Sequence, residues 1–165
     1  MFRLLSKENN VYTLGLEYKP FLGDLIGEIS QDIIDEDIEI PLYNITDRIM
    51  PMIIDFVKIN HLVKLDNIPK PLVSSQMIDN LPNIAQKPYV DFIESLTIEQ
   101  LEELIEAFNY LCIKPGIELC AAKIASLIRG KTTEEIRAML KIENDFSVEE
   151  ELRIKEENKW LQTSL

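Results

Sequence analysis

Side chains that could carry out catalysis are few in this sequence, and none stands in a recognisable catalytic setting. The single histidine, His61, lies beside Asn60 and Leu62, and no serine or cysteine forms a recognisable nucleophile with it. The five glycines do not cluster, so the chain has no glycine-rich loop that could hold phosphate. Carboxylates are abundant, but they fall at helix starts and solvated faces, where a structural role explains them. The sequence therefore predicts no catalytic residue and no cofactor.

The two cysteines are the remaining candidates for chemistry. Cys112 and Cys120 lie eight residues apart in a helical context with no paired histidines nearby. This setting favours two buried thiols over a zinc site or a disulfide, so we predict no metal site. A small hydrolase that uses one of these thiols is the enzymatic alternative. Replacing both cysteines by serine or alanine would test it.

Composition restricts the kinds of partner. The chain has 165 residues, 29 of them acidic and 17 basic, and its formal charge of -12 should repel phosphate backbones and anionic lipid. We therefore expect neither nucleic acid nor membrane as a partner. The apolar runs are too short to cross a bilayer, and the opening Met-Phe-Arg-Leu-Leu-Ser is too short for a signal peptide. These features predict an intracellular protein with a hydrophobic core of its own.

The first third of the chain reads as a small α/β region. Two strand-like runs at 2–6 and 11–17, separated by a polar turn, predict a β-hairpin. Apolar residues over 21–29 recur at helical spacing but are interrupted by two glycines, which predicts a short helix. Residues 38–42 alternate apolar and polar and include a proline, which is typical of a strand near a sheet edge.

A helix and a connector follow. Thr46 is placed to cap the helix, and Pro51 is expected to fall past the first turn and to kink or loosen the start. Residues 65–87 carry three prolines and little periodicity, which predicts an exposed connector and the main internal boundary.

The rest of the chain is predicted to be helical. A short helix is expected over 88–96, a longer one after Thr97, and another over 117–128 that stops at Gly130. Three capping boxes mark helix starts: Thr97 with Gln100, Thr132 with Glu135, and Ser147 with Glu150.

The last two predicted helices flank apolar residues that they cannot bury by themselves. Ile142 and Phe146 lie in the connector between them. Trp160, near the end of the final helix, either anchors an interface or folds back onto the domain, and the pattern alone favours neither. Exposed apolar surface rimmed by charge is typical of a partner-binding site. The residues alone therefore predict an interaction adaptor.

These same stretches resemble a known family. Gly-Lys-Thr-Thr-Glu-Glu-Ile-Arg at 130–137, Ile-Glu-Asn-Asp-Phe at 142–146 and Glu-Asn-Lys-Trp at 157–160 are similar to the C-terminal motifs of the S-phase kinase-associated adaptors. Asn-Tyr-Leu-Cys-Ile-Lys at 109–114 is similar to a further family motif. That family comprises the F-box-binding subunits of SCF ubiquitin ligases. The resemblance covers the whole chain, strongly after residue 88 and weakly before residue 70.

The resemblance implies a fold, a boundary and two binding faces. It implies an α/β, BTB/POZ-type domain over 1–112, a small β-sheet with helices that includes the connector at about 65–87, and a C-terminal helical extension over 113–165. The cullin side would use the BTB-like core with Asn109 and Tyr110. The F-box side would comprise Ile117, Ala121, Ile124, Ala125, Ile128, Ile136, Leu140, Ile142, Asn144, Asp145, Phe146 and Trp160.

The function implied is that of a non-catalytic adaptor, cytoplasmic and nuclear, that links F-box proteins to a cullin scaffold in ubiquitin-dependent proteolysis. An unpartnered chain is expected to self-associate weakly. One alternative keeps the F-box partners but acts outside cullin ligases. An elongin C-like adaptor is disfavoured because that type resembles the BTB portion but lacks the final helices.

The chain departs from the family pattern at several positions. Thr133 stands where many relatives carry a proline that some lineages hydroxylate. Phe56 and Val57 replace a Trp-Cys pair, Pro51 enters the same helix, and the acidic loop before residue 38 is short. The cullin-facing half has therefore drifted further than the F-box-facing half, and this drift motivates the alternative without a cullin.

Overall fold

A computed structural model of the chain describes residues 1–29 and 38–159. The chain divides into two compact units, unit 1 over 1–129 and unit 2 over 130–165. The boundary predicted after residue 112 stays a prediction, although the helix that follows it packs within unit 1.

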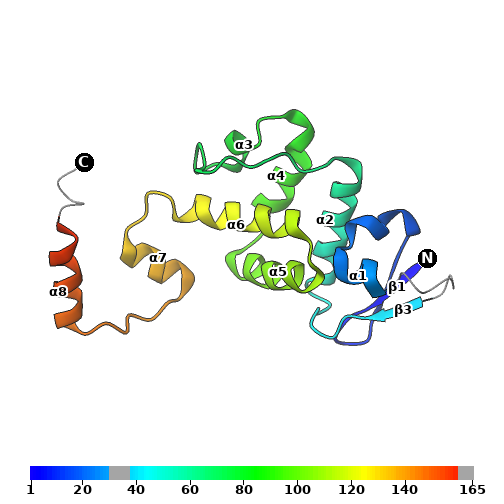
Figure 1. The fold of residues 1–165 in the computed structure, drawn as a ribbon, viewed down its shortest axis with the longest axis horizontal. Helices are drawn as coiled ribbons and strands as arrows, with labels where there is room; N and C mark the ends of the chain where they lie inside the picture. The colour runs from blue at the N-terminus through cyan, green and yellow to red at the C-terminus, as the bar shows by residue number, and fades with distance from the viewer. Residues whose placement is uncertain (30–37, 160–165) are drawn as a thin grey trace. The chain divides into compact units, whose positions relative to one another are not determined.

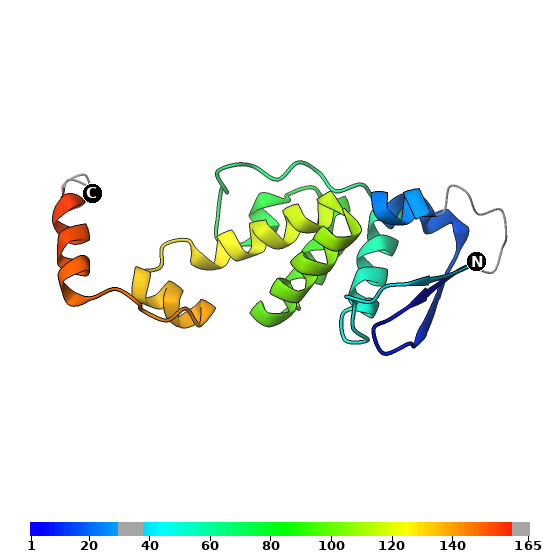
Figure 2. The ribbon, with the colours of Figure 1, turned by 60° about the horizontal axis from the view of Figure 1, so that its bottom comes forward.

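A three-stranded sheet lies at one end of unit 1 (Figure 2). Strand β1 (Phe2–Leu5) is central, paired antiparallel with β2 (Val11–Leu14) and parallel with β3 (Ile38–Pro41). This confirms the hairpin and the edge position of β3, where Pro41 is the last paired residue. Strand β2 ends before the predicted residue 17, because the 3-10 helix η1 (Leu16–Phe21) begins directly after it.

Two helices follow the hairpin, α1 (Asp24–Ile29) and α2 (Met50–Leu62). The predicted start of α2 is wrong. Ile49 occupies the N-cap, and the Thr46 hydroxyl is buried without a hydrogen-bond partner, so Thr46 does not cap this helix. Pro51 therefore lies within the first turn and not beyond it. Its missing N–H costs nothing there, because the first N–H groups of a helix have no intrahelical acceptor.

The remaining helices begin close to the predicted positions, and all three predicted capping boxes are present. In unit 1 they are α4 (Lys87–Glu94), α5 (Ile98–Leu111) and α6 (Lys114–Ile128), and two further short helices, α3 (Met77–Asn80) and the 3-10 helix η2 (Ile84–Gln86), form where none was predicted. In unit 2 they are α7 (Thr133–Leu140) and α8 (Val148–Glu157). Gly130 follows the end of α6 with a φ of 73°, as predicted for a residue just past a helix.

The core of unit 1 is built around Phe56 of α2. Its ring centroid lies 4.8 Å from that of Phe108 on α5 and 5.8 Å from that of Tyr89 on α4. All three side chains are fully buried. Helix α6 packs along α5, and the two helices lie side by side in both views (Figures 1 and 2). The sheet and six helices thus share one core, which fixes the direction of α6.

The segment over 64–86, called the strap below, differs from the prediction. Ile68, Met77 and Leu81 are buried, so the expectation of an exposed connector is wrong for these residues. The strap carries its own short helices, α3 and η2, and crosses unit 1 beside α6 (Figure 1). Periodicity failed to reveal it because its apolar residues are spaced irregularly between prolines.

Candidate partner-binding site

Helix α6 buries one side and presents the other. Leu119 and Cys120 are fully buried, whereas Ile124 and Ile128 are half-buried and Ala121 is exposed. The five α6 residues predicted for the F-box side, including Ile117 and Ala125, all retain some exposure. Residues three and four apart share a helix face, which explains why these five lie together. Two of the five residues are alanines, whose small side chains let the backbone of another helix approach this face closely.

An apolar groove of about 360 Å³ runs between α6 and the strap. Its α6 wall includes three of the predicted residues, and its other wall is the strap from Ile68 to Leu72. The groove is lined by Ile68, Pro69, Lys70, Pro71, Leu72, Ile117, Glu118, Ala121, Ala122 and Ala125. Sequence reasoning found the helical wall but missed the strap wall, because no local pattern places residue 70 beside residue 118.

Unit 2 exposes apolar residues in the connector between α7 and α8. Ile142 is 54% exposed and Phe146 is 47% exposed, as predicted for a segment without a cover of its own. Asn144 and Asp145 are exposed as well, and the α7 residues Ile136 and Leu140 are half-buried. Trp160, the remaining predicted F-box-side residue, lies outside the described residues.

Arg137 organises this connector. Its guanidinium carbon lies 5.6 Å from the centroid of the Phe146 ring, which is a cation–π geometry, and its Nη1 lies 3.8 Å from Oε1 of Glu151 on α8. Asn144 donates from Nδ2 to the same Glu151 oxygen at 2.7 Å. These contacts link α7, the connector and α8. Arg137 is the last residue of the family motif at 130–137, but its role could not be predicted from the sequence, because its partners are nine and fourteen residues away.

The capping boxes of unit 2 hold carboxylates in fixed positions. The backbone N–H of Thr132 donates to Glu135, and that of Ser147 donates to Glu150. Each hydrogen bond favours the charged carboxylate and lowers the pKa of that glutamate below its usual range. A lowered folded pKa adds helix stability above the unfolded pKa, and this contribution is lost as the pH falls through the folded value.

We therefore expect both caps to weaken only on strong acidification. In an NMR titration, the amide signals of Thr132 and Ser147 should move with midpoints below about 4.3, the ordinary value for glutamate. Glu135→Gln and Glu150→Gln should remove these transitions, because the amide oxygen still accepts the bond but does not titrate. The matched controls Glu134→Gln and Glu149→Gln remove the same charge one residue earlier and should leave them. A midpoint at or above about 4.3 would contradict the capping assignment.

The residues predicted for the cullin side lie on the other side of α5. Tyr110 lines a hollow of about 410 Å³ between α5 and the turn that precedes α2. Asn109, next to it, is exposed. Arg48 of that turn donates to Glu103 of α5 at 2.6 Å, which links the turn to the helix beside this hollow. The hollow thus combines Tyr110 with charged residues from two elements.

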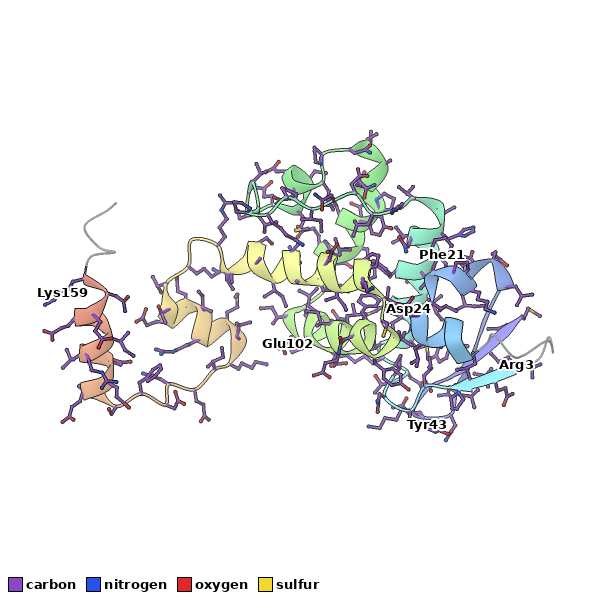
Figure 3. All side chains as sticks on the ribbon, viewed as in Figure 1. Arg3, Phe21, Asp24, Tyr43, Glu102 and Lys159 are labelled. Carbon is purple, nitrogen blue, oxygen red and sulfur yellow. The ribbon has the colours of Figure 1, made fainter. Side chains whose placement is uncertain are left out.

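The two cysteines differ in their surroundings. Cys120 is buried as predicted, and burial raises the pKa of its thiol to about 12. The prediction that Cys112 is buried is wrong: it follows α5 with a φ of 61° and is exposed. Its neighbours across a small pocket include Phe21 and Asp24, which lie where η1 and α1 meet the α5–α6 turn (Figure 3). The prediction assumed a helical setting for Cys112, but α5 ends at Leu111 and Cys112 is its left-handed C-cap.

Comparison with known proteins places these features in a family. A family model described as "Skp1 family, dimerisation domain" matches residues 117–161. The chain is 38% identical over 158 residues to the "S-phase kinase-associated protein 1 homolog" of Tetrahymena thermophila, covering 96% of this chain and 92% of the relative. The chain belongs to the Skp1 family.

The chain is also similar to two further relatives from the same family. The chain is 33% identical over 164 residues to "SCF ubiquitin ligase complex protein SKP1b" of Dictyostelium discoideum, covering 97% of this chain and 94% of the relative. It is 36% identical over 121 residues to "SKP1-like protein 11" of Arabidopsis thaliana, covering 73% and 71%. The mixed α/β architecture agrees with the predicted BTB/POZ-type class. All residues predicted for the F-box side fall within the segment matched by the Skp1 family model.

Proposed function

We propose that this chain is a non-catalytic adaptor of an SCF-type ubiquitin ligase that binds F-box proteins and joins them to a cullin scaffold. One observation carries the proposal: in the segment matched by the family model, the apolar side chains of Ile142 and Phe146 are exposed, and Arg137 holds the Phe146 ring in place. Aromatic side chains held on a surface in this way are typical interface anchors. The name of the Dictyostelium relative, an SCF ubiquitin ligase complex protein, supports the assignment.

The F-box side and the cullin side each bind one partner. The outward residues of α6 and the connector of unit 2 bind the F-box helices, because α6 presents aliphatic side chains beside alanines and the connector presents Ile142 and Phe146. Asn109, Tyr110 and the hollow beside them bind the cullin. That hollow combines the Tyr110 ring with the charged side chains of Lys7, Glu103 and Glu106, a polar character that suits a contact with a folded, charged scaffold.

The alternative of an F-box partner outside cullin ligases rested on sequence drift in the first half of the chain. Phe56 and Val57 are fully buried, so their replacement alters the core and leaves the surface unchanged. Pro51 lies in the first turn of α2, where its missing N–H removes no intrahelical hydrogen bond. The drift therefore gives no physical reason to abandon cullin binding, and a purified chain that binds a cullin would exclude the alternative.

A cysteine hydrolase is disfavoured on chemical grounds. The nucleophile of such an enzyme is a thiolate, and burial keeps the Cys120 thiol protonated. Cys112 is exposed, but the only histidine, His61, packs its ring against Tyr18 and Phe21, with centroids 5.0 and 5.3 Å away. Within the described residues, no cluster of three metal-binding side chains and no membrane-spanning helix is found.

The assignment of the F-box face is tested with Phe146→Ala. We expect it to weaken binding of a recombinant F-box domain by about 2 kcal/mol, or roughly thirtyfold, because it removes an exposed aromatic anchor. Val148→Ala is the matched control. Val148 is 75% exposed in the same unit but lies outside the predicted face, so its loss should change the affinity by less than about twofold.

The measurement is isothermal titration calorimetry on the full chain. Trp160→Ala is tested in parallel, since Trp160 was predicted for the same face. Unchanged affinity of both the Phe146 and the Trp160 variants would contradict the assignment. Failure of the wild-type chain to bind any F-box domain would contradict the proposed function itself. Weak self-association and localisation to cytoplasm and nucleus remain predictions of the same adaptor model.

A further inference from the structure

The strap is a built element, held by buried polar side chains. Asn80 is 2% exposed, and its Oδ1 accepts from the backbone N–H of Val73 at 2.7 Å. Its Nδ2 donates to the carbonyls of Ser74 and Gln76 at 2.9 and 2.7 Å. A buried amide whose groups are all satisfied within one segment fixes the path of that segment. Asn80 therefore shapes the strap from residue 73 to residue 80.

A second buried amide joins the two ends of the strap, and a guanidinium attaches the strap to the end of α6. Gln86 is 1% exposed, accepts from the N–H of Asp66 at 3.1 Å and donates to the carbonyl of Lys64 at 3.0 Å. In the middle of the strap, the carbonyl of Leu72 accepts a hydrogen bond from the guanidinium of Arg129, the residue that follows α6. Lys70 reaches Glu118 of α6 at 3.5 Å across the groove. The strap is thus held against α6 along the length of the groove.

The groove between them is apolar inside and charged only at its rim. Pro69, Pro71 and Leu72 face Ile117 and the alanines of α6. Lys70 and Glu118 are 76% and 55% exposed, so their ion pair lies in solvent and contributes little to stability. A volume of about 360 Å³ is within the range of small ligand pockets and can accept aliphatic side chains of a protein partner. Nothing polar inside the groove would recognise a polar ligand.

The continuity of the groove with the α6 face indicates its occupant. Ile117, Ala121 and Ala125 line the groove and also belong to the face that the proposed function assigns to the F-box partner. A helix that lies on this face can direct aliphatic side chains at i and i+3 or i+4 into the groove. The strap then contacts those side chains from the side opposite α6.

We propose that the strap is a second wall of the F-box site and holds an aliphatic anchor of the partner helix against α6. This proposal rests on the proposed function and adds to it residues that lie outside the segment matched by the family model. It makes the strap a determinant of which F-box helices bind, because the groove accepts aliphatic side chains and excludes charged ones.

The test compares three substitutions in the strap of the full chain, with affinity for a recombinant F-box domain as the readout. Leu72→Ala removes the strap wall, and Asn80→Ala releases the strap. Each should weaken binding about tenfold, the size expected for an anchor contact. Ile84→Ala is the matched control, since Ile84 is 87% exposed on the same strap but does not line the groove. Its affinity should change by less than about twofold.

The direction in which Asn80→Ala changes the F-box affinity shows whether the strap contacts the partner or covers its site. If the strap covered the site and had to move away, releasing it would tighten binding, and that result would overturn the proposal. If the groove instead took a second copy of this chain, Leu72→Ala would reduce self-association in sedimentation velocity and leave F-box affinity unchanged. That outcome would also overturn it.

A measurement on the wild-type chain keeps the proposal testable if a variant does not fold. In methyl NMR, addition of the F-box domain should shift the Leu72 methyl signals together with those of Ile117, while Ile84 stays unchanged. A shift at Ile117 with none at Leu72 would overturn the strap proposal and leave the proposed function intact. Absence of binding altogether would contradict the proposed function.

Discussion

Replacing Gly23 with alanine should lower the free energy of unfolding of unit 1 by about 4 kcal/mol, the size typical of severe backbone strain and clash. Gly23 has a φ of 85°, and a β-carbon added there would lie 1.9 Å from the carbonyl oxygen of Leu111 and 3.0 Å from Cγ1 of Ile113. The positive φ alone costs about 1 kcal/mol for a residue with a β-carbon. The oxygen belongs to the backbone at the end of α5, so it cannot turn away as a side chain would.

Gly27 provides the matched control four residues later. It lies inside α1, and a β-carbon added there meets nothing within 4 Å. Gly27→Ala should therefore stabilise unit 1 by about 0.5–1 kcal/mol, because glycine loses more backbone entropy than alanine in a helix. Urea denaturation followed by circular dichroism measures both. Similar unfolding midpoints for the two variants would show that the Gly23 contact with Leu111 is relaxed in solution.

The effect of Gly23 reaches the binding site because of where the clash falls. Leu111 ends α5, and α6 begins at Lys114, so a displaced Leu111 carbonyl moves the turn that sets the direction of α6. The folded fraction of Gly23→Ala should therefore bind an F-box domain more weakly than wild type, whereas Gly27→Ala should bind like wild type. Affinity measured at a low temperature, where both variants are folded, separates this effect from stability.

Local signals in the sequence predicted much of this fold. A capping box needs only four residues, and all three predicted boxes formed, including the Thr132 and Ser147 boxes of unit 2. The hairpin and the glycine stop at Gly130 also depend on neighbours in sequence. The helix that contains Pro51 shows the limit of such signals. A helix was correctly predicted there, but it begins three residues later than a cap at Thr46 predicts.

The parts that the sequence did not reveal depend on distant contacts. Asn80 and Gln86 look like ordinary loop residues until their buried hydrogen bonds are seen, and these bonds turn a supposed connector into the strap. Arg137 is one of several charged residues on α7, and only the fold places it beside Phe146. The aliphatic face of α6 was predictable from helical spacing, whereas the opposite wall of its groove was not.

The second large effect concerns the ion pair between α4 and α6. Lys123 Nζ lies 2.5 Å from Glu94 Oε2, and the two side chains are 8% and 44% exposed. Removing the carboxylate leaves an ammonium that is buried and unpaired, whereas removing the ammonium leaves a carboxylate that water can reach. Glu94→Ala should therefore destabilise unit 1 by about 3 kcal/mol, as expected for an uncompensated buried charge.

Replacing the other partner of the ion pair should change the free energy of unfolding only slightly. Lys123→Met keeps most of the side-chain volume and removes the buried charge, so we expect a change of less than about 1 kcal/mol in unfolding free energy. The double variant should be close to Lys123→Met alone, because no buried charge remains to be compensated. A cycle of urea denaturation curves over the wild type, the two single variants and the double variant measures this coupling.

The asymmetry between the two single variants decides what the pair does for the site. Lys123 lies on the face of α6 opposite Ala121, and its tie to α4 limits how far α6 can roll about its axis. If the pair serves this purpose, Lys123→Met should keep stability but weaken F-box binding, because α6 is then held by packing alone. Equal losses of unfolding free energy in Glu94→Ala and Lys123→Met would instead mean that the ammonium reaches water when its partner is removed. Packing against α5 alone would then set the orientation of α6.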